Sequence, residues 1–324
     1  MSSIAKGSSK FAQKAGCLKN LAAIFFDLDN TLIPTRKGDS KACRKLVEIL
    51  EKQHGIPREE GEQITDKFLQ SFRSCPDNAQ TTLDSWRSYL WCQALPANYQ
   101  HLSDVIYKNW LQLRYRYLAL TTEYENMLKK LSKFYLLALI TNGPSNGQWE
   151  KINKLNISQY FDCILVSSDL PWEKPNPNIF LAACNILNVK PQQCLMIGDK
   201  IQTDIQGGKE ANLGGTVWIP ITNDYDANSI TPRPDVIVKN LLEIYNFLPT
   251  TNVSALRNNS ERAAHGMDDS DDDDAAHCSS RPQRSQSQST ITSGASSSRR
   301  VSQQYRRQVS FSAVDFNDSS CDCS

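Results

Sequence analysis

The chain has 324 residues and a formal net charge of +1 at pH 7. Its length exceeds one average domain, and one domain with an insertion and a tail would account for it. The balanced charge gives no case for bulk binding to nucleic acid or to a membrane surface. No apolar run approaches the roughly 20 residues of a membrane span, and the ten cysteines are scattered without a CxxC metal pair. We therefore expect a cytoplasmic protein whose thiols stay reduced.

The first segment, residues 1–20, contains four lysines, several serines and no acidic residue. We expect a flexible basic leader here. An organelle transit peptide is the alternative, but such peptides are rich in Arg, which this segment lacks.

The first apolar run, Leu21 to Phe26, ends in two carboxylates, Asp27 and Asp29. This pattern is typical of a short buried strand that brings acids to its carboxyl end, where open α/β sheets place their chemistry. In an extended strand both side chains would point the same way, and close like charges are costly unless a cation or a proton lies between them. On these residues alone, a turn or a helix N-cap is an equally good interpretation.

From residue 36 to about residue 125 strand-like runs are absent, and apolar residues recur at helical spacing. The spacing predicts a helical cap, inserted after the first strand and long enough to bury a small core of its own. Its apolar faces are formed by Leu46, Ile49, Leu50, Phe68, Leu69, Phe72, Val105, Ile106, Trp110 and Leu113.

After the insertion, strand-like and helix-like segments alternate. The alternation predicts an α/β fold in which residues 21–35 and 126–249 form a doubly wound, Rossmann-like parallel sheet covered on both faces. Strands are expected near 135–141, 162–167, 194–198 and 215–219, helices near 146–156, 176–188 and 203–211, and a closing helix over 241–248.

Polar residues stand where these later strands end. Thr141 and Asn142 follow one strand, Lys174 lies on a proline-stiffened loop, and Asp199 follows another strand with Asp204 shortly after it. Because right-handed crossovers bring the carboxyl ends of parallel strands to one edge, we expect these side chains to lie near Asp27 and Asp29.

The four stretches together resemble the signature motifs of the haloacid dehalogenase-like phosphatases. The matching positions are DxDxT at Asp27–Thr31, then Thr141, Lys174, and GDxxxxD ending in Asp199–Asp204. Each motif is weak alone, but the set in this order is specific. The resemblance covers about residues 20–248, and the words DIQGG and TVWI favour the subgroup that hydrolyses N-acylneuraminate 9-phosphate to free sialic acid.

The resemblance implies Mg²⁺-dependent phosphomonoester hydrolysis through an aspartyl-phosphate. Asp27 would be the nucleophile, and Asp29 would protonate the leaving sugar oxygen and then activate water. Mg²⁺ would be bound by the carboxylates of Asp27 and Asp199 and by the main-chain carbonyl of Asp29. Thr141, Asn142 and Lys174 would bind the phosphoryl oxygens, with Asp204 in a supporting role.

Two cap residues, Trp110 and Arg114, also match this subgroup at their spacing, which implies contact with the acidic sugar. From the residues alone, Trp110 on an apolar stripe is more typical of a core, and Arg114 of a solvated charge.

The segment 250–324 has an acidic run followed by Ser/Arg/Gln-rich sequence, so it cannot offset its ordering entropy by burial and is expected to be disordered. Ser302 and Ser310 follow paired arginines, the arrangement that basophilic kinases prefer. An unmodified soluble tail explains the same sequence equally well.

Other functions share parts of this pattern. A different small phosphorylated sugar or acid could be the substrate, and a phosphomutase would use the same core. A hydrolytic dehalogenase would not need the acid at Asp29. From another class, the chain could be a catalytically idle binding protein regulated through its tail. We expect a small phosphorylated sugar as partner, and neither nucleic acid nor membrane.

Overall fold

The computed structural model describes residues 20–73, 82–222, 224–226 and 229–248. Most of the predicted leader and the whole predicted tail, with Ser302 and Ser310, lie outside these ranges. In the described part, six parallel strands form one sheet in the order β3-β2-β1-β4-β5-β6. The predicted doubly wound parallel sheet is confirmed. The strands are β1 (Ala23–Phe26), β2 (Leu136–Thr141), β3 (Cys163–Val166), β4 (Cys194–Gly198), β5 (Gly215–Trp218) and β6 (Val236–Ile237).

Strand β1 lies at the point where the strand order reverses. Phe26 at its end pairs with Leu139 of β2 on one side and with Ile197 of β4 on the other. Because β1 is parallel to both β2 and β4, the residues that follow these three strands lie at the same carboxyl edge of the sheet. In open α/β sheets this switch point is where ligands bind.

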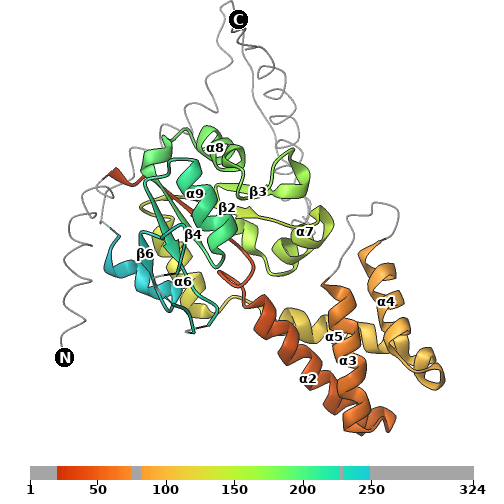
Figure 1. Ribbon diagram of the computed structural model, residues 1–324. Helices are drawn as coiled ribbons and strands as arrows, with labels where there is room; N and C mark the ends of the chain where they lie inside the picture. The colour runs from red at the N-terminus through yellow and green to blue at the C-terminus, as the bar shows by residue number, and fades with distance from the viewer. Residues whose placement is uncertain (1–19, 74–81, 223, 227–228, 249–324) are drawn as a thin grey trace, which may run out of the picture. The chain divides into compact units, whose positions relative to one another are not determined.

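Helices cover both faces of the sheet (Figure 1). On one face, leucines and isoleucines of α6 and α7 share a core with alternate residues of β1, β2 and β4. On the other face, a Cβ at Gly208 of α9 would lie 2.9 Å from Thr216 and 3.3 Å from Met196, so glycine lets that helix approach the strands closely. These helices are α6 (Thr122–Leu131), α7 (Ser145–Lys154), α8 (Pro177–Ile186) and α9 (Gln206–Glu210).

Three local features differ from the expected elements. The helix expected near 203–211 begins with a π-helical turn, Ile201–Ile205, before α9. The expected closing helix is a 3₁₀ helix, Leu241–Asn246. Strand β6 was not expected, because two residues are too few to show the alternation that indicates a strand.

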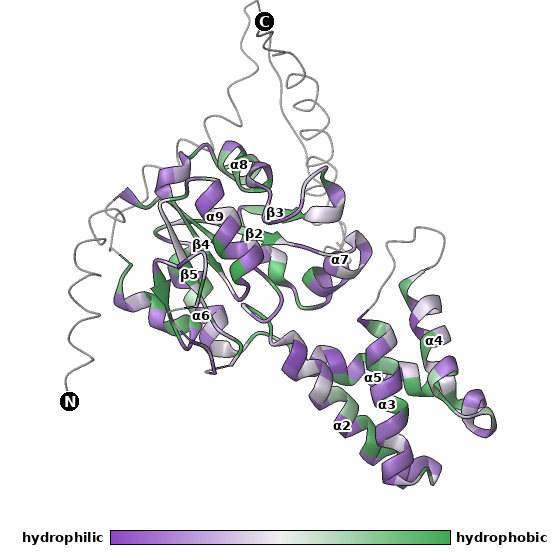
Figure 2. Ribbon diagram, in the orientation of Figure 1, coloured by the Kyte–Doolittle hydropathy of each residue, from purple (hydrophilic) through white to green (hydrophobic). Residues whose placement is uncertain are grey.

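The insertion between β1 and β2 is helical, as its spacing predicts, and has its own core. Trp91 stacks on Phe68 with ring centroids 3.8 Å apart, and Trp110 meets Phe68 edge-on at 4.8 Å. Hydrophilic and hydrophobic residues alternate along the helices of the insertion (Figure 2), as expected for helices that bury one face. Its elements are α2 (Thr35–His54), α3 (Arg58–Phe72), α4 (Leu83–Ala94), a 3₁₀ helix (Ala97–Leu102) and α5 (Ser103–Leu118).

None of the helices in the described ranges combines the length and the apolar character needed to cross a bilayer.

Candidate active site

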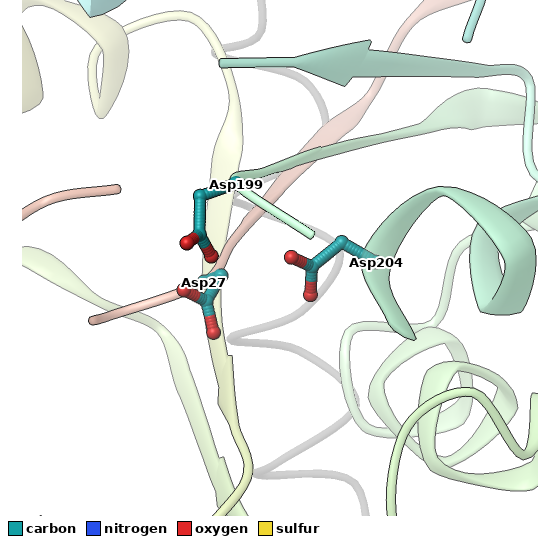
Figure 3. A group of neighbouring side chains, drawn as sticks. All are labelled: Asp27, Asp199 and Asp204. Carbon is teal, nitrogen blue, oxygen red and sulfur yellow. The ribbon is translucent and has the colours of Figure 1, made fainter. Parts of the chain in front are cut away.

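Three carboxylates from separate parts of the sequence meet at the carboxyl edge of the sheet (Figure 3). Asp27 follows β1, Asp199 follows β4, and Asp204 projects from the π-helical turn toward both. One oxygen from each lies within 4.8 Å of the others, and all three side chains are buried. The sequence predicted this meeting from the strand ends, and we call the three residues the carboxylate cluster.

The surroundings of the carboxylate cluster oppose its full ionisation. Burial raises the pKa of Asp27 to about 7, with Lys174 acting against the shift and Asp204 and Asp199 adding to it. Burial and the charge of Asp204 raise the pKa of Asp199 to about 6. Within the described residues, Oδ2 of Asp199 is buried without a hydrogen-bond partner. An oxygen-lined, electron-rich site with an unsatisfied ligand atom fits a hard divalent cation such as Mg²⁺.

Lys174 supplies a positive charge in contact with two members of the carboxylate cluster, Asp27 and Asp204. Its Nζ lies 2.6 Å from Oδ1 of Asp27 and 2.7 Å from Oδ1 of Asp204, and it donates to the carbonyl of Ile140 at 2.8 Å. Burial alone would lower the pKa of Lys174, but the charges of Asp204 and Asp27 raise it above its ordinary value. The lysine therefore stays charged beside the predicted nucleophile.

Asn142 and Thr141 complete this side of the site. The Asn142 side chain donates to the carbonyl of Lys174 at 2.8 Å and accepts from its N–H at 2.9 Å, so it fixes the lysine loop. Both of these contacts are with the main chain of Lys174, and contact of Asn142 with phosphate stays a prediction. The hydroxyl of Thr141 is buried and has no hydrogen-bond partner within the described part of the chain. A buried hydroxyl that lacks a partner is costly unless a ligand satisfies it.

Asp29 is held apart from the carboxylate cluster. Thr35 donates to Oδ1 at 2.5 Å, Gln148 donates to Oδ2 at 3.1 Å, and Nζ of Lys151 lies 2.7 and 2.5 Å from the two oxygens. Burial works against ionisation, but Lys151, with hydrogen bonds from Thr35 and Gln148, lowers the pKa of Asp29 to about 2. Neither Lys151 nor Gln148 was predicted from the sequence. Their spacing of three residues on a helix that starts just past Thr141 could have indicated them.

A family model described as haloacid dehalogenase-like hydrolase matches residues 21–212. This chain belongs to the haloacid dehalogenase-like hydrolases. It is 34% identical to N-acylneuraminate-9-phosphatase of Rattus norvegicus over 233 residues, which cover 70% of this chain and 93% of that protein. It is 29% identical to glyceraldehyde 3-phosphate phosphatase of Pyrococcus furiosus over 208 residues, 62% of this chain and 81% of that protein.

A solved structure shares the fold of this haloacid dehalogenase-like hydrolase. It is titled putative beta-phosphoglucomutase from Thermotoga maritima, with a TM-score of 0.51 at 19% identity, covering 70% of this chain and 98% of that one. The predicted family and enzyme class are thereby confirmed, and the named relatives in the sequence comparison are phosphoric monoester hydrolases.

In this haloacid dehalogenase-like hydrolase, the two predicted cap residues lie inside the core of the cap. Trp110 is fully buried against Phe68 and Phe72. Arg114 is buried, donates from Nε to Asp39 at 2.8 Å, and lies over the ring of Phe72 with its Cζ 5.1 Å from the centroid. The structure thus shows packing roles for both residues, and contact with substrate stays a prediction.

Proposed function

We propose that the chain is a Mg²⁺-dependent phosphomonoesterase that acts through an aspartyl-phosphate on Asp27, with N-acylneuraminate 9-phosphate as substrate. The observation that carries the proposal is the carboxylate cluster, in which the buried Oδ2 of Asp199 has no hydrogen-bond partner within the described residues. The relatives named N-acylneuraminate-9-phosphatase support the substrate, because their similarity to this chain covers 93% of their length.

Both halves of the proposed reaction depend on Asp27. The carboxylate of Asp27 attacks phosphorus in line with the leaving sugar oxygen, and Thr31 donates to its Oδ2 at 3.2 Å, which holds its orientation. Water then attacks the phosphorus of the aspartyl-phosphate, so that inorganic phosphate leaves and Asp27 is regenerated. Dividing the reaction in this way avoids direct attack of water on a very inert ester.

Charge neutralisation accompanies both halves. The ammonium of Lys174 and the hydroxyl of Thr141 would bind the phosphoryl oxygens, which would give Thr141 a hydrogen-bond partner that it lacks among the described residues. Mg²⁺ would be held by Asp27, Asp199 and the main-chain carbonyl of Asp29, and it would supply the positive charge that allows the phosphate dianion to approach these acids. Asp29 would give a proton to the sugar oxygen once the bound phosphate dianion has raised its pKa from the low value that Lys151 imposes, and it would later take a proton from the attacking water.

We also propose that the protein acts in the cytoplasm, since its scattered cysteines suit a reducing compartment. We propose Ser302 and Ser310 as sites for a basophilic kinase, because each follows a pair of arginines. Incubation of the full chain with such a kinase, followed by mass spectrometry of the tail, tests this part separately from catalysis.

A phosphatase for another small phosphorylated compound is the alternative, favoured by the similarity to the glyceraldehyde 3-phosphate phosphatase. The deciding experiment measures inorganic phosphate released from N-acetylneuraminate 9-phosphate and from a panel of sugar phosphates, with Mg²⁺ or with EDTA, for the wild type and Asp27→Asn. We expect Mg²⁺-dependent release that is strongest on the sialic acid ester and absent in the variant.

Three other outcomes would change the assignment. Release only from other panel members would discard the sialic acid substrate and keep the mechanism. No release from any ester would favour the idle binding protein, while a rearranged product that keeps its phosphate would indicate a phosphomutase.

A further inference from the structure

The side chain of Gln148, on helix α7, is buried beside the candidate active site with one polar atom left unpaired. The residue is only 4% exposed. Its Nε2 donates to the main-chain carbonyl of Asn142 at 2.6 Å and to Oδ2 of Asp29 at 3.1 Å. Its Oε1 is buried and has no hydrogen-bond partner within the described part of the chain. A buried acceptor of this kind is costly unless a ligand or a water supplies the donor.

The orientation of the Gln148 amide follows from its contact with Asn142. A main-chain carbonyl oxygen can only accept a hydrogen bond, and the nitrogen is the only donor in a Gln side chain. Turning the amide by half a rotation would place two acceptor oxygens against each other. The unpaired atom of Gln148 is therefore an acceptor, and the missing partner is a donor.

The turn after β2 holds Gln148 in this position. Gly143 has a φ of +132°, and a Cβ there would lie 2.6 Å from Nε2 of Gln148, so glycine is needed for this close approach. The N–H of Gly143 donates to Oγ of Ser167 at 3.1 Å, and its carbonyl accepts from the hydroxyl of Ser168 at 2.9 Å. Gln148 thus packs against a turn that is tied to the end of β3.

The unpaired acceptor lies close to the groups proposed to bind phosphate. Thr141, whose hydroxyl would bind a phosphoryl oxygen, directly precedes Asn142, the residue to which Gln148 donates. Because Oε1 and Nε2 share one carbon, Oε1 is also near the carboxylate of Asp29. The substrate atoms that can reach it are those only a few bonds from phosphorus. In the phosphate ester of a polyol, the first hydroxyl beyond the ester oxygen is on the carbon next to the esterified carbon.

We propose that Gln148 is a specificity-determining residue, which accepts a hydrogen bond from that hydroxyl and so selects phosphate monoesters of 1,2-diols. The inference rests on the proposed function, because the ester must be bound at Asp27. N-acetylneuraminate 9-phosphate has such a hydroxyl at C8, beside the esterified C9. An ester without it leaves Oε1 of Gln148 unpaired, and a site built to bind a hydroxyl discriminates against that ester.

The test compares two esters that differ only in this hydroxyl, sn-glycerol 3-phosphate and 3-hydroxypropyl phosphate, by the kcat/KM of phosphate release with Mg²⁺. A second pair, N-acetylneuraminate 9-phosphate and its 8-deoxy analogue, makes the same comparison on the proposed substrate. We expect the wild type to favour the hydroxylated ester of each pair about tenfold or more. The ratio within a pair is the readout, because damage to the fold or to the metal site lowers both values together.

Gln148→Met, which preserves the length of the side chain without the amide, should remove this preference. Gln148→Lys is the second variant, because lysine can still donate to the Asn142 carbonyl but cannot accept, and it should remove the preference as well. Gln192→Met is the matched control, since Gln192 is exposed, and it should keep the wild-type ratio. Thermal melting verifies that each variant is folded, and Gln148→Lys carries the test if Gln148→Met does not fold.

Equal kcat/KM for the two esters of a pair in the wild type would overturn the proposal, in favour of a water bound at Oε1. A wild-type ratio in both Gln148 variants would also overturn it, since another residue would then accept the hydroxyl. Release from the glycerol pair but not from the sialic acid ester would refute only the proposed substrate, because the glycerol pair still tests Gln148. A wild type inactive on every ester would refute the proposed function itself.

Discussion

Replacing Lys174 by methionine should lower the free energy of unfolding, because this lysine neutralises part of the negative charge of the carboxylate cluster. Its side chain is only 1% exposed and makes ion pairs at 2.6 and 2.7 Å with Asp27 and Asp204. Methionine preserves most of the volume but leaves three buried carboxylates, within 4.8 Å of one another, without that cation. Removing one partner of a buried ion pair typically costs about 3–5 kcal/mol.

For a fold of this size, 1 kcal/mol corresponds to a change in Tm of about 2–4 °C, so we expect Lys174→Met to lower Tm by about 6–20 °C in EDTA at pH 8. The loss should shrink at pH 5.5. Without the lysine, the charge that lowers the pKa of Asp27 is gone, so Asp27 is protonated at that pH and the repulsion falls. Added Mg²⁺ should also restore part of the stability.

Differential scanning calorimetry at both pH values, with EDTA or Mg²⁺, measures these shifts. Lys133→Met is the control, because Lys133 is exposed at the surface of the same fold. The double variant Lys174→Met with Asp204→Asn should regain stability, since it removes one of the uncompensated charges. A Lys174→Met protein that melts like the wild type in EDTA at pH 8, or that loses the same amount at both pH values, would refute this electrostatic account.

Three further outcomes follow from the same geometry. In metal-free protein the raised pKa values of Asp27, about 7, and Asp199, about 6, mean that the folded state binds more protons than the unfolded state above pH 4, so stability falls as pH rises toward 7. Mg²⁺ competes with those protons, and the Tm increase caused by Mg²⁺ should therefore grow between pH 5.5 and 8; an increase that is constant with pH would contradict the assignment of these ligands. Gly198→Ala would place a Cβ 2.2 Å from Oδ2 of Asp204, and the displaced carboxylate should reduce kcat about 10²-fold or more in a phosphate-release assay, whereas wild-type activity would show that the strand end can move. Arg114→Met should lower Tm with KM unchanged, because Arg114 is packed inside the cap; a KM increase at unchanged Tm would instead support substrate contact.

The order of elements in the α/β core could be predicted from sequence because its strands are buried on both faces. Such strands consist of unbroken apolar runs, as in Leu136 to Ile140, and the polar residue that ends each run marks the carboxyl edge. The family followed from the same positions, since the order of Asp27, Thr141, Lys174 and Asp199 is a property of the chain alone. Strand β6 could not be predicted from hydrophobic periodicity. Its two residues form a strand because they pair with β5, and their own sequence shows no strand pattern.

The sequence by itself therefore determined the sheet, the helical insertion and the acids that come together at the end of β1. Only the tertiary structure decided which partner each acid receives. The pairing of Asp29 with Lys151, and of Lys174 with Asp204, joins residues whose proximity depends on how helices and loops pack against the sheet. Burial and those contacts together then determine the charge state of each group. Burial and two neighbouring carboxylates raise the pKa of Asp27 despite Lys174, whereas Lys151 and two hydrogen bonds lower the pKa of Asp29 despite burial. Local patterns cannot contain that information, since it arises from contacts between distant parts of the chain.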